Sequence, residues 1–175
     1  MGNGVAELRR RFLRVGIAVA LIVAADQITK SIAVDRLTRG VPVRVVGSLV
    51  QFDLASNSGG AFSSFQGATP LLAIGALAAT FYLVRMVRHS DDRWIVAALT
   101  LLLGGALGNL SDRLFRAPSF LRGEVIDFIR LPNWPTFNIA DMGVTFGAVL
   151  LVLRTLFGPR ASTEPNKSAK SVNSA

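Results

Sequence analysis

Long apolar stretches separated by short polar ones run along most of this chain, and four of them predict membrane-spanning helices. No charged residue lies between Asp53 and Arg85, and none lies between Arg93 and Asp112. Each gap has room for about 20 residues in a helix, the length that crosses a bilayer. Two further apolar stretches lie at either end of the chain. We therefore expect spans near residues 12–34, 68–87, 94–111 and 139–157.

The first of these stretches is also compatible with a cleaved signal peptide, because four arginines between residues 9 and 14 precede it. It continues directly into Asp26 and Lys30, which lie four residues apart on one helical face. No clear small-residue cleavage site is present beyond Ala24 and Ala25. We expect a retained helix.

Short β-strands are expected between the first two spans. Val41–Val46 and Leu49–Leu54 flank Gly47 and Ser48, which predicts a β-hairpin at about residues 41–55 on the outer membrane surface. Residues 158–175 are rich in Ser, Ala, Asn and Lys, which predicts a disordered cytoplasmic tail. The expected fold is an all-α bundle of four transmembrane helices with a small extracytoplasmic β-hairpin or cradle, formed as one domain by residues 1–157.

Composition supports a membrane protein, since 51% of the residues are hydrophobic. The net charge of +8 comes from basic residues at the ends of spans, so anionic membrane lipids are the expected partner and nucleic acid is not. One side of the predicted bundle has eleven Lys and Arg residues in the termini and the middle turn, against seven in two longer loops opposite. Both termini are therefore expected in the cytoplasm.

Several polar residues cluster at the predicted outer ends of the spans. Because successive spans alternate in direction, these positions share one depth in the outer leaflet. Intramembrane polar groups of this kind usually face the bundle interior and mark a functional site. Simpler interpretations remain: Asp26 with Lys30, and Asp112 with Arg113, are also suited to structural ion pairs, and Asn57–Gly60 to a turn. The cluster consists of Asp26, Lys30, Asn57 to Phe62, Asn109, Asp112, Arg113, Asn138 and Asp141.

Two carboxyl groups lie in unusually apolar surroundings. Asp127 lies in the run Val125–Ile129 between Gly123 and Pro132, which predicts an extended segment whose buried charge needs a partner. Asp141 begins the last span, where it also fits a capping box with Asn138. If the two carboxyls meet, they share a proton and can hydrolyse a peptide bond without a covalent intermediate. The helix dipole favours Asp141 as the ionised base and Asp127 as the proton donor.

Other chemistries are disfavoured by what the chain lacks. It has no cysteine, and its one histidine, His89, is expected in a cytoplasmic turn, which excludes thiolate catalysis and a Ser-His-Asp or histidine-rich metal site at the outer face. Glycoside cleavage also uses paired carboxylates, but no aromatic platform for sugars is evident. A small transporter or proton relay is the alternative function, although the inner halves of the spans offer no ionisable side chain. A structural assembly protein would leave Asp127 unexplained.

The order of the polar motifs resembles that of the lipoprotein signal peptidases, or type II signal peptidases, of bacteria. The resemblance covers nearly everything except the tail. The motifs are Asp26 with Lys30, Asn57-x-Gly59-x-Ala61-Phe62, Gly108-Asn109-x-x-Asp112-Arg113, Gly123-x-Val125-x-Asp127-Phe128 and Phe137-Asn138-x-Ala140-Asp141. One departure is the segment Arg116–Leu121, which lengthens the gap between Arg113 and Asp127.

The resemblance implies an inner-membrane aspartyl endopeptidase that removes the signal peptide from diacylglyceryl-modified prolipoproteins, cutting on the N-terminal side of the lipidated cysteine. It assigns catalysis to Asp127 and Asp141, near the outer leaflet. It implies a substrate site formed by Asn57, Gly108, Asn109, Arg113, Asn138 and Ala140. Asp26, Lys30, Gly59 and Asp112 are expected to support that site. We expect no cofactor and no metal, prolipoproteins and membrane lipids as partners, and a monomer.

Overall fold

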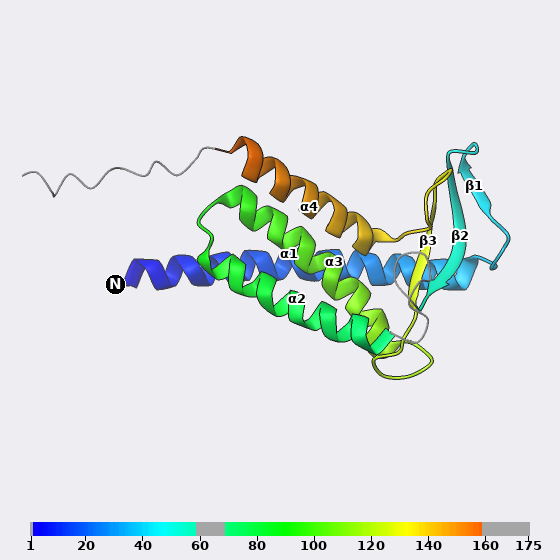
Figure 1. Cartoon of the computed structure of the whole chain (residues 1–175), viewed down its shortest axis with the longest axis horizontal. Helices are drawn as coiled ribbons and strands as arrows, with labels where there is room; N and C mark the ends of the chain where they lie inside the picture. The colour runs from blue at the N-terminus through cyan, green and yellow to red at the C-terminus, as the bar shows by residue number, and fades with distance from the viewer. Residues whose placement is uncertain (1, 59–68, 159–175) are drawn as a thin grey trace, which may run out of the picture.

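The structure is a computed structural model that describes residues 2–58 and 69–158. Its described part contains four helices: α1 (Gly2–Arg36), α2 (Thr69–His89), α3 (Arg93–Phe115) and α4 (Ile139–Phe157). All four are long and apolar enough to cross a membrane. They run side by side, with a small sheet at one end of the bundle (Figure 1). The expected helical membrane fold is confirmed.

Two helices extend beyond the spans expected from the apolar pattern. Helix α1 begins ten residues before residue 12, and α3 ends four residues after residue 111. Hydropathy locates only the part of a helix that suits lipid, whereas the added residues include Glu, Leu, Arg and Ala, which favour helix in any solvent. Helix α3 begins where the side chain of Asp92 accepts the N–H groups of Trp94 and Ile95.

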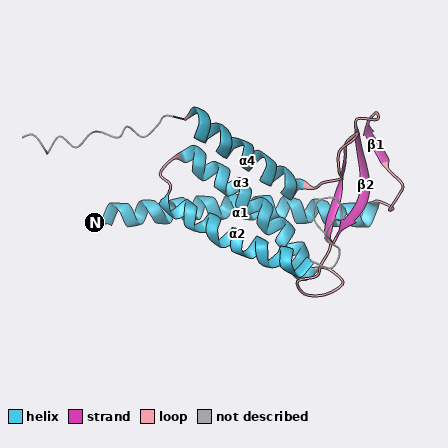
Figure 2. Ribbon diagram, in the orientation of Figure 1, coloured by secondary structure: helices cyan, strands magenta, loops and turns pink. Residues whose placement is uncertain are grey.

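The sheet consists of three antiparallel strands in the order β1 (Val43–Val46), β2 (Val50–Asn57) and β3 (Val125–Arg130). The expected hairpin is β1 with β2. The extended segment around Asp127 is also confirmed, and it adds a strand that the sequence did not predict: β3 pairs with β2, with Ala55 opposite Asp127 (Figure 2). A bridge between Ile129 and Phe137 ties the segment before α4 to the same sheet.

Close contacts around α3 depend on glycine. A Cβ at Gly105 would lie 2.3 Å from the carbonyl oxygen of Ala140, and one at Gly104 would lie 2.7 Å from the Ile22 side chain. Helices in lipid gain little from burying apolar groups, so close backbone packing holds them together. Large apolar side chains on the outside, such as Phe81 and Leu71, are 75% and 68% exposed, as expected of a lipid-facing surface.

The end of the bundle opposite the sheet contains the first residues of α1, the turn between α2 and α3, and the last residues of α4 (Figure 1). Ion pairs hold it together: Arg11 lies 2.8 Å from Asp91, and Arg154 donates to Asp92 at 2.6 Å. His89 is exposed at this end, away from the sheet. Residues 159–175, expected to form a disordered tail, lie outside the described residues.

Candidate active site

Asp127 and Asp141 line one cleft of about 300 Å³ where the sheet meets the helices. Asp127 comes from β3, and Asp141 comes from the first turn of α4. Asn138 bridges them: its side-chain amide donates to Asp127 Oδ1 at 2.6 Å, and its backbone N–H donates to Asp141 Oδ2 at 3.2 Å. The two carboxyls that the sequence singled out are therefore brought together by the fold.

Asp127 is held in an environment that favours its protonated form. Its side chain is buried in β3, which packs between β2 and the helices. Burial, together with the nearby charge of Asp141, raises the pKa of the Asp127 carboxyl to about 7. Hydrogen bonds from Asn138 and Asn57 and the positive charge of Lys30 act in the opposite direction. A carboxyl with this pKa can act as a proton donor near neutral pH.

Asp141 belongs both to the N-terminal cap of α4 and to the cleft. The capping box is present, because Asn138 Oδ1 accepts the N–H of Asp141 at 2.9 Å while Asp141 accepts the N–H of Asn138. The other oxygen of Asp141, Oδ1, accepts an N–H from the Asn109 side chain at 2.7 Å. Both carboxylate oxygens thus face N–H donors, which stabilises the ionised form. The cap and the site are formed by the same residue.

A buried ionic network lies next to the carboxyl pair. The Lys30 ammonium is 2.7 Å from Asp26 Oδ2 and 2.8 Å from Asp112 Oδ2, and all three side chains are fully buried. Arg116 Nε lies 2.6 Å from the other oxygen of Asp112. The ion pair of Asp26 with Lys30, which the sequence left open as an alternative, is present. The other alternative, Asp112 with Arg113, is not among the ion pairs of the described residues, because adjacent residues on a helix do not face each other.

Two predicted substrate residues are not among the residues that line the cleft. Ala140 is fully buried and donates its N–H to Asp26 Oδ1 at 2.9 Å, and a Cβ at Gly108 would lie 2.8 Å from Asp26 Oδ2. These two residues therefore pack α3 and α4 around Asp26 instead of lining the cleft. The remaining four predicted residues lie closer to the carboxyl pair: Asn57, Asn109 and Arg113 line the cleft, and Asn138 bridges its carboxyls. Gly59 lies outside the described residues.

Arg113 presents a cation to the cleft. Its Nη1 donates to the backbone oxygen of Asn109 at 3.2 Å, one turn earlier in α3. Its Nε is buried and has no hydrogen-bond partner within the described part of the chain. A buried donor without a partner is costly, so a group that accepts its hydrogen would bind favourably there.

Three contributors were not identified from the sequence. Gln27 donates to Asp26 Oδ2 and Asp112 Oδ1 at 3.2 and 3.1 Å, and Arg116 belongs to the lengthened segment that the sequence only noted as a departure. Trp134 lines the cleft from the loop before α4. The available signals were a glutamine beside Asp26 in an apolar stretch and a tryptophan beside Pro135. Nothing in the sequence says what these side chains touch.

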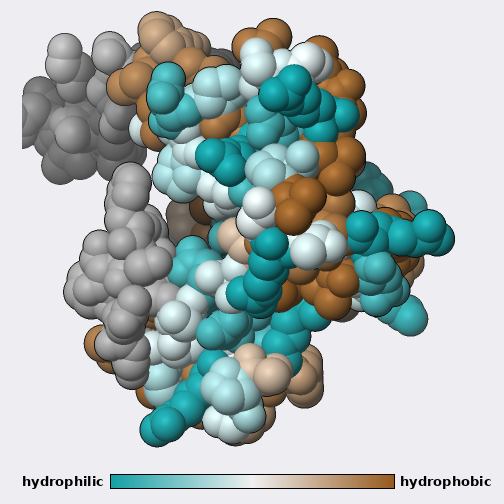
Figure 3. Space-filling model, turned by 90° about the vertical axis from the view of Figure 1, so that its right-hand side faces the viewer, coloured by the Kyte–Doolittle hydropathy of each residue, from teal (hydrophilic) through white to brown (hydrophobic). Residues whose placement is uncertain are grey.

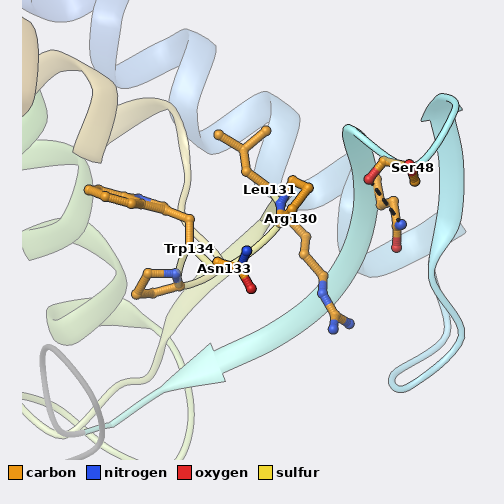
Figure 4. A pocket seen from close by; sticks show the side chains of 8 residues that line it. Ser48, Arg130, Leu131, Asn133 and Trp134 are labelled. Atoms are coloured by element: carbon orange, nitrogen blue, oxygen red, sulfur yellow. Dashed lines mark hydrogen bonds between the residues drawn. The ribbon is translucent and has the colours of Figure 1, made fainter.

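A larger hollow of about 770 Å³ lies beside the cleft, between the turn at Ser48 and the loop before α4. Among the side chains that line it, Figure 4 shows Arg130 at the end of β3 and Trp134 in the following loop, with the Trp134 ring pointing away from Ser48. Trp134 and Pro135 line both cavities. The sheet end of the molecule is largely hydrophilic (Figure 3). Among the described residues, no group of three or more His, Asp or Glu side chains is placed to hold a metal ion.

Comparisons with known proteins identify the family. The sequence model of "Signal peptidase (SPase) II" matches residues 18–157. The chain belongs to the signal peptidase II family. It is 43% identical over 164 residues to the lipoprotein signal peptidase of Rhodococcus jostii, covering 94% of this chain and 80% of that one. It is 44% identical over 149 residues to the lipoprotein signal peptidase of Mycobacterium tuberculosis, covering 85% and 74%.

The fold agrees with this assignment. A solved structure described as a bacterial membrane enzyme matches with a TM-score of 0.75 and 27% identity, covering 90% of this chain and 94% of that one. The expected family is therefore confirmed. As a member of the signal peptidase II family, the protein is an aspartic-type signal peptidase, a hydrolase, and a bacterial membrane protein that crosses the bilayer several times.

Proposed function

We propose that this signal peptidase removes the signal peptide from diacylglyceryl-modified prolipoproteins, and that Asp127 and Asp141 catalyse the hydrolysis. The cut falls on the N-terminal side of the lipidated cysteine. The observation that carries the proposal is the meeting of two carboxyls from β3 and α4 in one cleft, bridged by Asn138. The names of the relatives, lipoprotein signal peptidase, support the substrate class.

The charges around the cleft support one shared proton. Four carboxyl groups face three cations, so the cluster is neutral when a single carboxyl is protonated. A buried cluster with a net charge would be strongly disfavoured. The carboxyls are those of Asp26, Asp112, Asp127 and Asp141, and the cations are Lys30, Arg113 and Arg116.

The hydrogen bonds favour one division of labour between the two carboxyls. Asp141 accepts N–H groups at both oxygens and is the ionised base, whereas Asp127, with a pKa of about 7, keeps the proton. Asp141 takes a proton from water, whose oxygen attacks the scissile carbonyl carbon while Asp127 protonates the carbonyl oxygen. As the tetrahedral intermediate collapses, one of its hydroxyls returns a proton to Asp127, the C–N bond breaks, and the departing amine receives the proton held by Asp141.

We propose that Arg113 and Asn109 hold the substrate backbone. A peptide within a membrane must have its carbonyl groups paired, because lipid offers no hydrogen bonds. The buried Nε of Arg113 and its side chain in the cleft provide donors for such a carbonyl. A cysteine anchored by diacylglycerol would hold the scissile bond at the membrane surface, at the depth that we assign to the cleft.

The arrangement supports an orientation with both termini in the cytoplasm of a bacterium and the cleft toward the outer leaflet. The start of α1, the turn between α2 and α3, and the end of α4 share one end of the bundle (Figure 1). That end has arginines in all three places: Arg11, Arg93 and Arg154. Basic residues flanking spans mark the cytoplasmic side. A proton relay is disfavoured, because α4 has no ionisable residue between Asp141 and Arg154.

The direct test is cleavage of a diacylglyceryl-modified prolipoprotein by the purified protein in detergent or lipid, with the new N-terminus identified by mass spectrometry. The parent should cut before the lipidated cysteine, and Asp127→Asn and Asp141→Asn should not. Asp53→Asn is the matched control, because Asp53 is a β2 carboxylate paired with Arg130 outside the cleft. Equal cleavage by either cleft variant would end the two-carboxyl account.

A further inference from the structure

Lys30 reaches the catalytic pair through a single amide. Its ammonium lies 2.9 Å from Asn109 Oδ1, and Asn109 Nδ2 in turn donates to Asp141 Oδ1 at 2.7 Å. A lysine ammonium has three N–H donors and no acceptor. Its donors are directed at Asp26, Asp112 and the Asn109 oxygen, so each has an acceptor.

This contact determines which end of the Asn109 side chain faces the cleft. In the opposite orientation the amide N–H₂ would point at the ammonium, and the amide oxygen would point at the carboxylate of Asp141. Both contacts would be repulsive within a buried cluster. Asn138 acts in the same direction, because its Nδ2 donates to Asn109 Oδ1 at 3.1 Å. The Asn109 oxygen therefore has two donors opposite it, and its nitrogen is left to Asp141.

We infer that Lys30 is a positioning residue, whose ammonium fixes the orientation of Asn109 so that the amide donates to Asp141 and keeps it ionised as the base. The inference rests on the proposed function and assigns a role within it. Lys30 touches neither carboxyl of the pair in the described contacts; it acts through Asn109. The charged groups around it are Asp26 from α1, Asp112, Arg113 and Arg116 from or next to α3, Asp127 from β3 and Asp141 from α4.

A kinetic test separates positioning from charge balance. Lys30→Met removes the donor but leaves Asp26 and Asp112 with one cation fewer, so the fold itself could suffer. The double variant Lys30→Met with Asp26→Asn removes one charge of each sign and keeps an oxygen for the Ala140 N–H. Both variants should lower kcat by about 10- to 100-fold, the effect of losing one charge-assisted hydrogen bond, with KM within about twofold. Recovery of wild-type kcat by the double variant would overturn the inference.

A spectroscopic test needs no substrate. Infrared difference spectra of protein labelled with carboxyl-¹³C aspartate follow the protonated carboxyl band of the pair as a function of pH. The band is assigned by its change in Asp127→Asn. In Lys30→Met the band should persist to higher pH than in the wild type. Part of that shift comes from charge alone, because Lys30 lowers the pKa of Asp127. The positioning role predicts a larger shift when Asn109 is present than in an Asn109→Ala background.

Equal shifts in the two backgrounds would show that Lys30 acts only through its charge, and would refute the inference. Ser111→Ala is the control, because the described side-chain hydrogen bond of Ser111 goes to the Leu107 oxygen within α3. This variant should leave unchanged the pH at which the protonated carboxyl band falls to half of its intensity. A protein that shows the Asn109-dependent shift but does not cleave the prolipoprotein would contradict the proposed function and leave the positioning role standing.

Discussion

The side-chain amide of Asn138 lies 2.6 Å from Asp127 Oδ1, and the same residue is the N-cap of the helix that begins with Asp141. One asparagine therefore holds a strand carboxyl and a helix carboxyl at once. Its position links the first residues of β3, through Ile126 O at 3.2 Å, to the start of α4. The geometry of the carboxyl pair depends on this residue as much as on the two aspartates.

Replacing Asn138 should separate its two roles. Serine caps helices well but has no amide, so Asn138→Ser should lower the thermal stability less than Asn138→Ala does, while kcat falls by about 10-fold or more. Asn138→Ala loses the cap as well and should lower the free energy of unfolding by about 0.5–2 kcal/mol. Melting in detergent and cleavage kinetics measure the two effects. Parent-like kcat in Asn138→Ser would show that the contact with Asp127 has no part in catalysis.

Asp127 should make both activity and stability depend on pH. Because the pKa of Asp127 is raised from 3.8 to about 7, the folded state binds its proton more tightly than the unfolded state. This contribution to stability is complete below about pH 4 and is lost as the pH rises through about 7. The melting temperature of the parent, measured relative to that of Asp127→Asn, should therefore be lower at pH 8 than at pH 5. The variant is the reference because residue 127 cannot ionise in it. A pH-independent difference between the two proteins would contradict the raised pKa.

The rate of cleavage should fall as the pH rises above about 7, because Asp127 must be protonated to donate. A plot of kcat against pH tests this. The substrate-binding constant of an inactive Asp141→Asn variant should stay the same over the same pH range. A fall in kcat that begins only well above pH 8 would show that Asp127 is not the acid.

Arg113 should act on substrate binding. Arg113→Gln removes the buried Nε donor and the positive charge in the cleft, so KM for the prolipoprotein should rise by about 10-fold with a smaller change in kcat. Arg122→Gln, an exposed change of the same type between α3 and β3, is the matched control and should leave KM unchanged. Unchanged KM in Arg113→Gln would exclude a role in holding substrate.

Gly105 should be required for the contact between α3 and α4. Gly105→Ala would place a methyl group 2.3 Å from the Ala140 oxygen, forcing the helices apart at a cost of about 1–3 kcal/mol in the free energy of unfolding. Gly75→Ala in α2 has open space around it and should cost nothing comparable. Thermal melting of both variants in one detergent measures the difference. Equal melting temperatures would show that the two helices can move apart freely.

The sequence alone determined the parts of this protein that depend on local pattern. The apolar stretches predicted four helices because a span needs about 20 residues that lipid tolerates, and alternating residues predicted the hairpin. The isolation of Asp127 among apolar neighbours and the capping box at Asp141 were visible without a fold. The order of the motifs indicated the family.

Only the tertiary structure decided which side chains meet. Pairing of β3 with β2 holds Asp127 beside Asn138, the N-cap of α4, and such contacts between distant segments leave no periodic signal in a sequence. Asp112 pairs with Lys30 and Arg116 instead of its neighbour Arg113, because a helix turns adjacent side chains about 100° apart. Gly108 and Ala140 are matched by motif, and their described contacts are with Asp26. The orientation of Asn109 follows from a lysine 79 residues away, a relationship fixed by the fold alone.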